Sequence, residues 1–493
     1  MQARKKIVIV GAGPGGLTSA MVLARRGYDV EVFEKEAVVG GRNAELRLGE
    51  YRFDVGPTFL MMKFVLDKAF AEAGEQSEEW LKFVRLDPMY RLIFPDFTLD
   101  ITGDRERLKE QIARVFPGEE KGLDRFYERE SERYKHIYAC LEKDYSSLWD
   151  FLRPGFLKAL PYIPLGKTIF DYLGNYFGPE RLRLSFTFQS KYLGMSPWEC
   201  PAFFVILPYI EHQFGVFHVQ GGLSEISRAM ARVAEKHGAR VHLSTPVRQV
   251  IVEQGSVCGV ELEDGRRVLA DETILNADFA HAMHTLVPKG VLRRWSPEKL
   301  AKKKFSCSTY MLYLGVNKTF PDMPHHSILF AADYQRNAKE IFGNERLSED
   351  FSFYIRNSGV TDPEVAPEGK SGIYILVPAP NNESDIDWEQ EGPQLRERVL
   401  DAIATRTPWG DLRPFIEVER AITPADWARM GVHQGATFNL AHSLDQMLYF
   451  RPHNRFEELE HCWLVGGGTH PGSGLPTIYQ SGLIAANLIG AAQ

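Results

Sequence analysis

A glycine-rich loop close to the N-terminus is the first feature with the spacing to carry out chemistry. Residues 11–16 read GAGPGG, the GxGxxG pattern. Gly11 allows a tight turn, Gly13 lets a pyrophosphate approach the backbone, and Gly16 lets a helix pack closely on a strand. The free N–H groups and the positive dipole end of the following helix would bind the phosphates. The loop predicts a dinucleotide site, and the alternative is a packing turn without a ligand.

The residues around this loop predict the elements that such a site needs. The apolar residues 6–10 predict a buried strand, helical spacing runs from 17 to 24, and residues 28–33 predict a second strand. The second strand ends on Glu34, whose carboxylate can accept hydrogen bonds from ribose hydroxyls. The unit would bind FAD or NAD and does not separate them.

A second glycine pair follows the predicted ribose-binding strand. Residues 38–42 read VVGGR, which places Gly40, Gly41 and Arg42 just after Glu34. The backbone of such a loop can lie along the pyrophosphate and ribityl chain of a flavin, with the Arg42 guanidinium as a phosphate partner. The alternative for Arg42 is a solvated loop charge. This pair favours FAD as the dinucleotide.

A third glycine-rich loop lies near the other end of the chain. Residues 462–465 predict a short strand, residues 466–476 read GGGTHPGSGLP, and helical spacing continues to about residue 491. The positive end of that helix suits a group that gains negative charge, such as the N1–C2=O2 edge of a reduced flavin. Taken alone, the loop could be a packing turn. Together with the first loop, it predicts one flavin site shared between both ends of the chain.

The middle of the chain returns to the nucleotide domain. Residues 221–238 predict a glycine turn and a helix, and residues 257–269 predict a hairpin. Residues 274–278 predict a strand that ends at the ligand-binding edge of an open α/β sheet. A chain of 493 residues is longer than a single hydrophobic core usually supports, so we expect two intertwined domains.

The expected fold class is α/β, with a Rossmann-like FAD-binding domain assembled from discontinuous segments. A mixed-sheet substrate domain and a helical membrane-facing subdomain complete it. The expected FAD-binding segments are 1–75, 216–290 and 426–493, the substrate and helical membrane-associating segment is 76–215, and the substrate-domain sheet is 291–425.

Composition narrows the classes of partner. The net charge of −7 argues against nucleic acid, because phosphate binding needs a basic face. The five cysteines form no CxxC pair, which argues against a metal site or a disulfide framework and suits a reducing cytosol. No secretory signal and no run of about 18 apolar residues is present, so we expect a cytoplasmic protein. Peripheral attachment to a membrane is compatible with these features.

These residues resemble the bacterial-type phytoene desaturase family, within the flavin amine oxidase superfamily. The resemblance covers most of the chain, and GGGTHPGSGLP followed by Ser481 and Gly482 is similar to the family signature. Further matching stretches are 306–308, 325–327, 361–363, 366–369, 376–378, 435–436 and 450–455. The resemblance implies the family's fold, FAD as cofactor and carotenoid-type substrates.

The resemblance also implies roles for individual residues. Val247 would act through its backbone toward the adenine. The residues that would contact FAD are Gly11, Gly13, Gly16, Glu34, Gly40, Gly41, Arg42 and Val247 from the N-terminal and middle parts, and Gly467, Gly468, Gly474 and Leu475 from the C-terminal loop.

Residues of about 75 to 215 are expected to handle the substrate. They are rich in aromatic side chains, and between about 148 and 177 these alternate with Arg153, Lys158 and Lys167. Such a segment could lie on a membrane surface with its cations at headgroup level, and the alternative is the core of a helical subdomain. A long apolar isoprenoid has almost no solubility in water, so its enzyme would gain by taking it directly from the bilayer.

Catalysis is assigned mainly to the flavin, whose N5 would accept a hydride from the substrate. The released proton needs an acceptor, and His325 and His326 are weak candidates. Adjacent residues on a strand point to opposite faces, so at most one of the two should face the site. Arg153 and Asp150 are further polar candidates. His470 lies in the flavin loop, where it could either shape the backbone or take part in acid–base chemistry.

Several functions are compatible with these motifs. The leading hypothesis is a desaturase of a long phytoene- or carotenoid-type isoprenoid, with a quinone or oxygen as electron acceptor. A carotenoid oxygenase, isomerase or saturase of the same family is an alternative. A non-catalytic prenyl-binding escort protein is another, although the intact glycine loops argue against it. An amine oxidase is less favoured. The sequence has no second GxGxxG pattern after the first nucleotide unit, which argues against a tightly bound nicotinamide cofactor.

Overall fold

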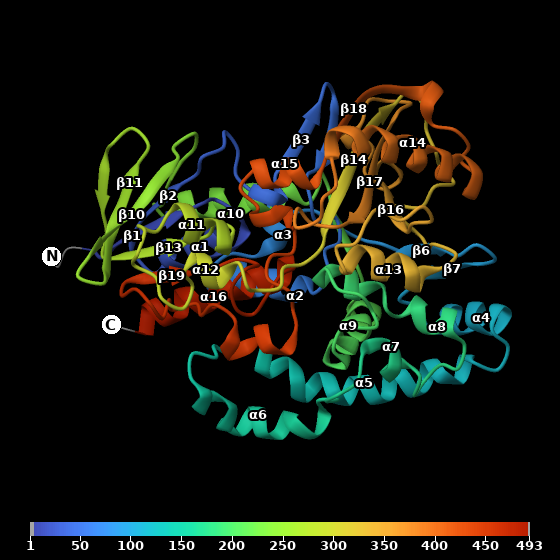
Figure 1. The fold of residues 1–493 in the computed structure, drawn as a ribbon, viewed down its shortest axis with the longest axis horizontal. Helices are drawn as coiled ribbons and strands as arrows, with labels where there is room; N and C mark the ends of the chain where they lie inside the picture. Colours follow the sequence, from blue (N-terminus) through green and yellow to red (C-terminus); the bar gives the residue numbers. More distant parts are fainter. Residues whose placement is uncertain (1–3, 492–493) are drawn as a thin grey trace.

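A five-stranded parallel sheet carries the N-terminal glycine loop in the computed structural model, which describes residues 4–491. The strand order is β19-β13-β1-β2-β9, and every neighbouring pair is parallel. The strands are β1 (Lys6–Val10), β2 (Asp29–Phe33), β9 (Arg240–His242), β13 (Glu272–Leu275) and β19 (Cys462–Leu464). They come from three distant parts of the sequence, so this sheet is assembled from discontinuous segments (Figure 1).

Both faces of the parallel sheet are covered, which explains the continuous apolar run in β1. Ile7 and Ile9 belong to one core cluster, whereas Val8 and Val10 belong to another, because successive side chains on a strand point to opposite faces. The first cluster includes α1 (Pro14–Arg25), α10 (Ser224–Lys236) and α16 (Leu475–Ala491). The second includes the antiparallel strands β10 (Val247–Glu253), β11 (Ser256–Leu262) and β12 (Arg267–Leu269), with α11 (Phe279–Thr285) and α12 (Pro297–Leu300).

A seven-stranded mixed sheet forms the second half of the molecule. Its order is β18-β14-β17-β16-β15-β6-β7. The strands are β6 (Tyr90–Ile93), β7 (Thr98–Ile101), β14 (Ser308–Val316), β15 (His326–Leu329), β16 (Phe353–Asn357), β17 (Ser371–Ala379) and β18 (Ile416–Ile422). The helix α14 (Trp388–Arg406) packs on one face in a separate apolar cluster. The opposite face presents Met311, Tyr354 and Tyr374 to the core shared with the first half.

The helices that follow β7 in the sequence form a layer at the bottom of Figure 1. They are α4 (Arg105–Val115), α5 (Glu120–Leu141), α6 (Pro154–Ala159), α7 (Ile169–Leu173), α8 (Glu180–Ser185) and α9 (Ile206–Phe214). Smaller elements join these parts: α2 (Lys63–Glu72), α3 (Ser77–Trp80), α13 (Tyr334–Phe342), α15 (Pro424–Arg429) and the ribbons β3 (Glu45–Leu48) with β4 (Tyr51–Asp54) and β5 (Phe83–Arg85) with β8 (Phe217–Val219).

The α/β fold is confirmed, with one difference in the segment 76–215. This segment was expected to be helical, yet it also supplies β6 and β7 to the mixed sheet. Pairing of β6 with the buried β15 places Leu92 in an apolar core, which a surface helix would not achieve. The domain boundaries themselves stay a prediction. Within residues 4–491, no helix combines the length and apolarity needed to cross a membrane.

Candidate functional site

The N-terminal glycine loop is packed too closely to accept side chains. A Cβ on Gly16 would lie 2.6 Å from the Gly11 carbonyl oxygen, and a Cβ on Gly13 would lie 3.0 Å from the Asn276 amide nitrogen. Gly13 caps α1 in an extended conformation, so the free N–H groups of the first helical turn open toward the loop. The cradle fits a pyrophosphate, the group for which this spacing is typical.

Asn276, at the end of β13, holds this loop in shape. Its amide donates hydrogen bonds to the carbonyl oxygens of Gly11 (2.9 Å) and Gly13 (3.1 Å). On the other side, its amide oxygen lies 3.4 Å from the position of a Cβ on Gly466, the first residue of the C-terminal loop. One side chain therefore lies against both glycine loops, which are separated by more than 400 residues in the sequence.

Glu34 lies where the ribose-binding acid is expected. It follows β2 and is almost fully buried. Its carboxylate accepts hydrogen bonds from the backbone N–H of Ala12 (2.7 Å) and of Glu36 (3.0 Å). The Thr245 N–H donates to the Glu34 carbonyl (2.8 Å), which brings the start of β10, and Val247 with it, to the same edge. Contacts of Glu34 and Val247 with FAD stay a prediction.

The second glycine pair lies against the first loop. The Gly40 N–H donates to the Ala12 carbonyl (2.8 Å), and a Cβ on Gly41 would lie 3.9 Å from Gly13 Cα. Arg42 turns toward the C-terminal part of the chain, where its Nη1 donates to the Thr437 carbonyl (2.8 Å) and lies 4.0 Å from Asp278. Its side chain is partly exposed, so the predicted phosphate contact would need one of its remaining N–H groups.

The C-terminal loop reaches the same place because β19 pairs with β13, and β13 with β1. Gly474 precedes α16 with φ of +108°, a conformation that side chains other than glycine rarely adopt. The Ser473 hydroxyl donates to the Phe438 carbonyl (2.6 Å). Gly467, Gly474 and Leu475 line a cavity together with Arg42, whereas a Cβ on Gly468 would meet Phe279 at 2.6 Å, outside that lining.

Arg451 supports this loop from inside the protein. Its guanidinium donates to the carbonyl oxygens of Gly467 (2.7 Å) and Thr469 (3.1 Å), and the residue is fully buried. No carboxylate pairs with it among the described residues. Burial lowers the pKa of Arg451 to about 9, which still leaves it charged at neutral pH.

A cavity of about 250 Å³ connects the glycine loops to the mixed sheet. The loops contribute Arg42, Gly467, Gly474 and Leu475; the sheet contributes Thr309, Met311, Tyr354, Tyr374 and Leu376; the helical part contributes Phe188, Lys191 and Tyr192. A mostly apolar and aromatic lining next to a dinucleotide cradle suits an apolar substrate that must meet a flavin. The helices and the mixed sheet thus complete a site that the glycine loops begin.

The two candidate histidines lie behind this cavity, and neither belongs to its lining. His326 Nδ1 lies 2.6 Å from the Tyr354 hydroxyl, and its ring stacks on Phe59 at 4.0 Å between centroids. The Tyr354 hydroxyl in turn lies 2.9 Å from Thr58 Oγ1. Burial lowers the pKa of His326 well below its ordinary value. Phe59 and Tyr354, which His326 contacts, both line the cavity, whereas His326 itself does not.

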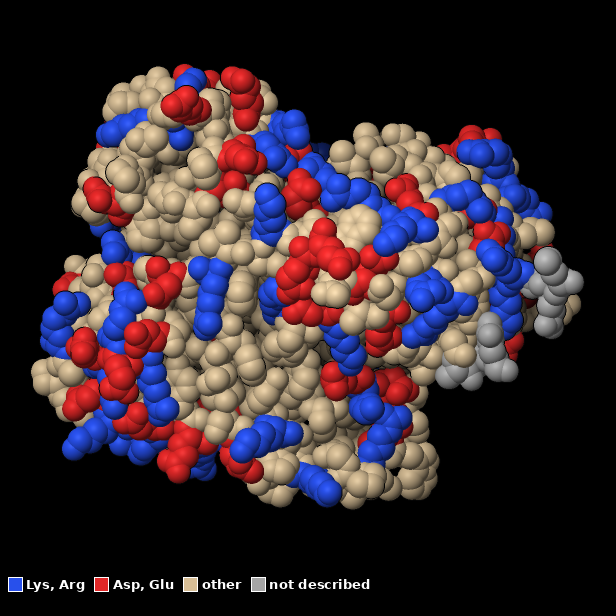
Figure 2. All heavy atoms as spheres, turned by 180° about the vertical axis from the view of Figure 1, so that it is seen from behind, with Lys and Arg blue, Asp and Glu red and all other residues tan. Residues whose placement is uncertain are grey.

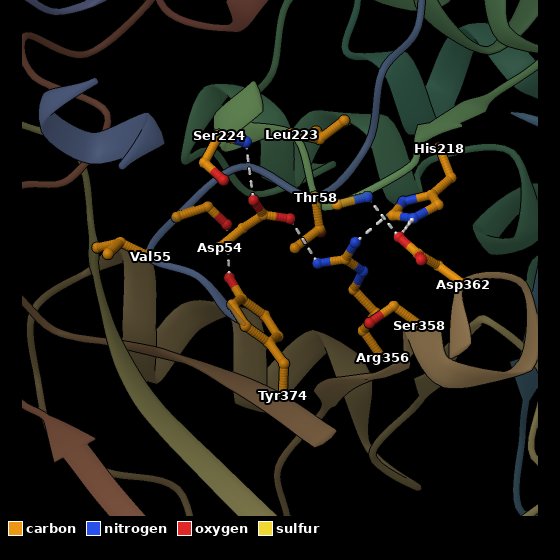
Figure 3. A network of polar contacts seen from close by, with 12 residues as sticks. Asp54, Val55, Thr58, His218, Leu223, Ser224, Arg356, Ser358, Asp362 and Tyr374 are labelled. Carbon is orange, nitrogen blue, oxygen red and sulfur yellow. Dashed lines mark hydrogen bonds and ion pairs between the residues drawn. The ribbon is translucent and has the colours of Figure 1, made fainter. Parts of the chain in front are cut away.

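His325 belongs instead to a buried polar network, part of which Figure 3 shows. Arg356 connects it: Nη1 donates to Asp54 (2.7 Å) and Nε donates to His325 (3.2 Å). Arg356 Nη2 also meets His218 (3.1 Å), whose other nitrogen lies 2.8 Å from Asp362. The network joins β4, β8 and β16, so it ties the two halves of the molecule together.

The remaining polar candidates also lie outside the cavity lining. Arg153 pairs with Asp150 (2.7 Å) and donates to the Asp144 carbonyl (2.8 Å) on a partly exposed surface. His470 is buried, and its Nε2 lies 2.7 Å from the Lys143 carbonyl. Burial lowers the pKa of His470 to about 4, so it is neutral at pH 7. This fits a loop-shaping role for His470, and a catalytic role for Arg153 stays a prediction.

Three residues with clear roles in this geometry were not singled out from the sequence: Asn276, Arg451 and Lys191. Asn276 was noted only as part of a strand end, the position where α/β sheets bind ligands. Arg451 lies in a stretch that carries the family resemblance. Lys191 sits in an aromatic segment of the helical part, and no local pattern marks it as facing the cavity.

Comparison with known sequences identifies the family. Residues 14–490 match the family described as "Flavin containing amine oxidoreductase". The chain is 50% identical over 490 residues to a 4,4′-diapophytoene desaturase (4,4′-diapolycopene-forming) from Methylomonas sp, covering 99% of this chain and 96% of that protein. It is 37% identical to an all-trans-zeta-carotene desaturase from Myxococcus xanthus, covering 98% and 93%.

Solved structures share the fold at low sequence identity. An oxidoreductase from Methanosarcina mazei superposes with a TM-score of 0.66 at 17% identity, over 98% of this chain and 100% of that chain. A putrescine oxidase bound to putrescine superposes with a TM-score of 0.62 at 16% sequence identity, over 99% of both chains. A RAB GDI from Plasmodium falciparum gives 0.53 at 13%, over 85% and 89%. The fold alone is therefore shared by proteins of different function.

The family match and the glycine cradle agree on the cofactor, which is FAD. The match spans nearly the whole chain, including both ends that form the cradle. The chain belongs to the flavin containing amine oxidoreductase family and, within it, to the carotenoid desaturases of the bacterial phytoene desaturase type.

Proposed function

We propose that this FAD-dependent desaturase acts on an isoprenoid of the 4,4′-diapophytoene type. The observation that carries this proposal is the 50% identity to a 4,4′-diapophytoene desaturase, compared with 37% to a zeta-carotene desaturase and 31% to a lycopene-forming phytoene desaturase. The apolar and aromatic cavity supports a hydrocarbon substrate. Bound FAD would supply the oxidant, accepting a hydride from the substrate at N5.

The chain's own residues would bind and orient both partners. The glycine loops and Glu34 would hold the ADP part of FAD, and the positive end of α16 would face the edge that gains negative charge. Phe188, Tyr354 and Leu376 would align the hydrocarbon and exclude water. A long isoprenoid would not fit entirely within the 250 Å³ cavity, so part of the bound substrate would project out of the cavity.

We also propose that the substrate enters from a membrane through the surface of residues 148–165. Six of its large apolar side chains are exposed, Trp149 by 77% and Leu165 by 70%, and the others are Leu148, Leu152, Leu157 and Leu160. Figure 2 has a largely uncharged area with a few basic side chains along the lower edge, where α6 lies. Apolar residues with cations at their margin suit a lipid surface. As part of the same proposal, the enzyme is cytoplasmic and peripherally attached to the membrane, and a quinone or oxygen accepts its electrons.

The experiment that tests the function supplies FAD-loaded protein with liposomes that carry either 4,4′-diapophytoene or phytoene. Products that have lost two hydrogens per step, formed faster from 4,4′-diapophytoene, are the expected result. Faster conversion of phytoene would contradict the substrate assignment. Oxygen gained by the product would favour the oxygenase alternative, and an unchanged mass would favour an isomerase.

A further inference from the structure

Lys191 is an unusual group to find in a hydrocarbon-binding cavity. It lies in the 3₁₀-helix η4 (Phe188–Leu193) and belongs to the cavity lining. Within the described part of the chain, its ammonium nitrogen has no hydrogen bond and no carboxylate partner; its neighbours are rings. The Nζ atom lies 4.9 Å from the ring centroid of Tyr334, 5.3 Å from that of Phe330 and 5.9 Å from that of Phe188. A lysine without a counter-charge in such surroundings is costly when protonated.

The rest of the cavity lining contains no competing base. Among the described residues that line it, none is Asp, Glu or His. Arg42 also lines the cavity, but its guanidinium offers N–H donors and no acceptor. The ionisable groups that share the cavity with Lys191 are otherwise thiol and phenols. Burial raises the pKa of Cys307 to about 12 and raises those of Tyr192 and Tyr354 further. Burial also raises the pKa of Tyr334, which packs on Lys191 from α13.

A short chain of neighbouring residues links Lys191 to the C-terminal glycine loop. It interacts electrostatically with Cys307, whose neighbour Ser306 accepts a hydrogen bond from the Phe438 N–H (3.1 Å). The Phe438 carbonyl accepts from Ser473, which lines the cavity beside Gly474. Lys191 and the loop that would hold the flavin thus belong to one continuous wall.

We propose that Lys191 is the catalytic base that accepts the proton which the substrate releases during desaturation. This inference rests on the desaturase function proposed above. Bound FAD would accept a hydride, that is, one hydrogen of a substrate carbon together with its bonding electron pair. The neighbouring carbon loses its hydrogen as a proton to the lone pair of Lys191 Nζ, and the C–H electron pair left behind forms the new double bond. The resulting ammonium then returns the proton to solvent.

The protonation state of Lys191 supports this role. Burial lowers its pKa to about 7, and the electrostatic effect of Cys307 opposes this only in part. The neutral amine is the form that accepts a proton. Desaturation should therefore rise with pH through about 7 and level off above it, because the amine is protonated at lower pH. A base of matched pKa contributes about 100-fold or more to a rate.

The test compares Lys191→Met and Lys191→Arg with the FAD-loaded wild type in single-turnover reduction of the flavin by substrate in liposomes. Both variants should lose about 100-fold in rate, since arginine keeps the cation over the rings but cannot give up its proton. A small primary amine such as ethylamine should restore part of the rate in Lys191→Met. Lys318→Met is the matched control, because Lys318 also lies over two rings, Phe320 and Phe415, but on the surface.

A second measurement needs no catalysis. Labelling of lysines with a limiting amine-reactive reagent across pH, read peptide by peptide by mass spectrometry, should place the midpoint of Lys191 near 7. A midpoint above 9 for Lys191, or wild-type rates in Lys191→Arg, would overturn the inference. If the wild type labels as expected but desaturates no polyene, the proposed function fails instead.

Discussion

At the residue scale, the flavin cradle depends on backbone approaches that exclude side chains. A Cβ on Gly13 would lie 3.0 Å from the Asn276 amide nitrogen, and Asn276 in turn donates to two carbonyl oxygens of the loop. A buried hydrogen bond of this kind is worth about 1 kcal/mol, and more is lost when a partner is left unpaired. The loop therefore has little freedom to move aside for a larger residue.

Gly13→Val should yield protein that folds but carries little FAD. The branched side chain would displace Asn276 and fill the space that the pyrophosphate needs. The flavin-to-protein ratio from the absorbance spectrum is the measurement, with the expected ratio below about a tenth of the wild-type value, a loss of at least ~1.4 kcal/mol in binding.

Gly155→Val is the matched control, because nothing lies within 4 Å of a Cβ at that position. It should retain the wild-type flavin ratio. Full flavin content in Gly13→Val would contradict the assignment of the N-terminal loop.

At the scale of elements, two helix N-termini from opposite ends of the sequence meet at the predicted flavin site. α1 begins at the first glycine loop and α16 at the third, and parallel pairing of β1, β13 and β19 brings them together. The positive end of α16 should favour the reduced flavin, which carries more negative charge than the oxidised form.

Gly474→Asp should lower the flavin reduction potential relative to Gly474→Asn. The positive φ of Gly474 strains any other residue, so the two variants share that strain and differ only in charge. A carboxylate beside the helix terminus would destabilise the reduced flavin by about 1 kcal/mol, or ~20 mV for a two-electron couple. Potentials from dye equilibration check this, and equal potentials in both variants would contradict the dipole argument.

The edge of the parallel sheet predicts a weakness in acid. Burial by itself would raise the pKa of Glu31 on β2, but hydrogen bonds from Lys6, Arg240 and His242 outweigh it and lower the pKa to about 2. A carboxylate with a depressed pKa stabilises the folded state above its ordinary value of 4.5, and this stabilisation is lost as the pH falls toward 2.

Glu31→Gln should therefore lower the melting temperature at neutral pH and make it less sensitive to acid. Thermal scans at fixed rate between about pH 6 and 3 would measure this slope. Glu368→Gln, at an exposed loop position, removes the same charge without these partners and should keep the wild-type slope. A wild-type slope in Glu31→Gln would show that the ion pairs at this edge do not contribute.

At the scale of the whole molecule, exposed apolar side chains are concentrated on one surface. Residues 148–165 carry six of the exposed large hydrophobic residues, and this segment packs beside α5 in the helical layer of Figure 1. A soluble protein rarely keeps such a cluster without a partner. A membrane partner would also explain how a water-insoluble substrate arrives.

Replacing Trp149 and Leu165 together by Glu should weaken binding to anionic phospholipid vesicles by at least tenfold in sedimentation. Two charges would replace two large apolar groups, each of which contributes about 1.5–3 kcal/mol when buried. Leu269→Glu is the control, because Leu269 is 62% exposed but lies on β12, in the β10-β11-β12 sheet, and not within residues 148–165. Unchanged vesicle binding in the double variant would contradict the membrane proposal.

Much of the fold and of the cofactor site could be predicted because the relevant signals are local. The GxGxxG loop with Glu34, the GGR loop and the C-terminal loop each combine a strand, a turn and a helix within a short stretch, and backbone approach demands glycine at set positions. The helix predicted from residue 476 begins at Leu475, and the hairpin predicted over 257–269 forms from β11 and β12.

The catalytic side of the site could not be predicted in the same way. His325 and His326 were plausible by residue type, but burial and partners assign them to packing behind the cavity. Whether a polar residue is paired depends on residues far away in the sequence. Asn276 bonds a loop 265 residues earlier. The surroundings of Lys191 likewise emerge only in the fold, where the rings of Phe330 and Tyr334 lie beside its ammonium group.

The sequence by itself therefore determined where the glycine loops form and predicted one FAD site shared between both ends of the chain, because glycine spacing records a local backbone requirement. The tertiary structure alone decided which side chains face the cavity between the two halves. Exposure, pairing and pKa arise from long-range packing, and in this cavity that packing leaves one amine, Lys191, among aromatic rings.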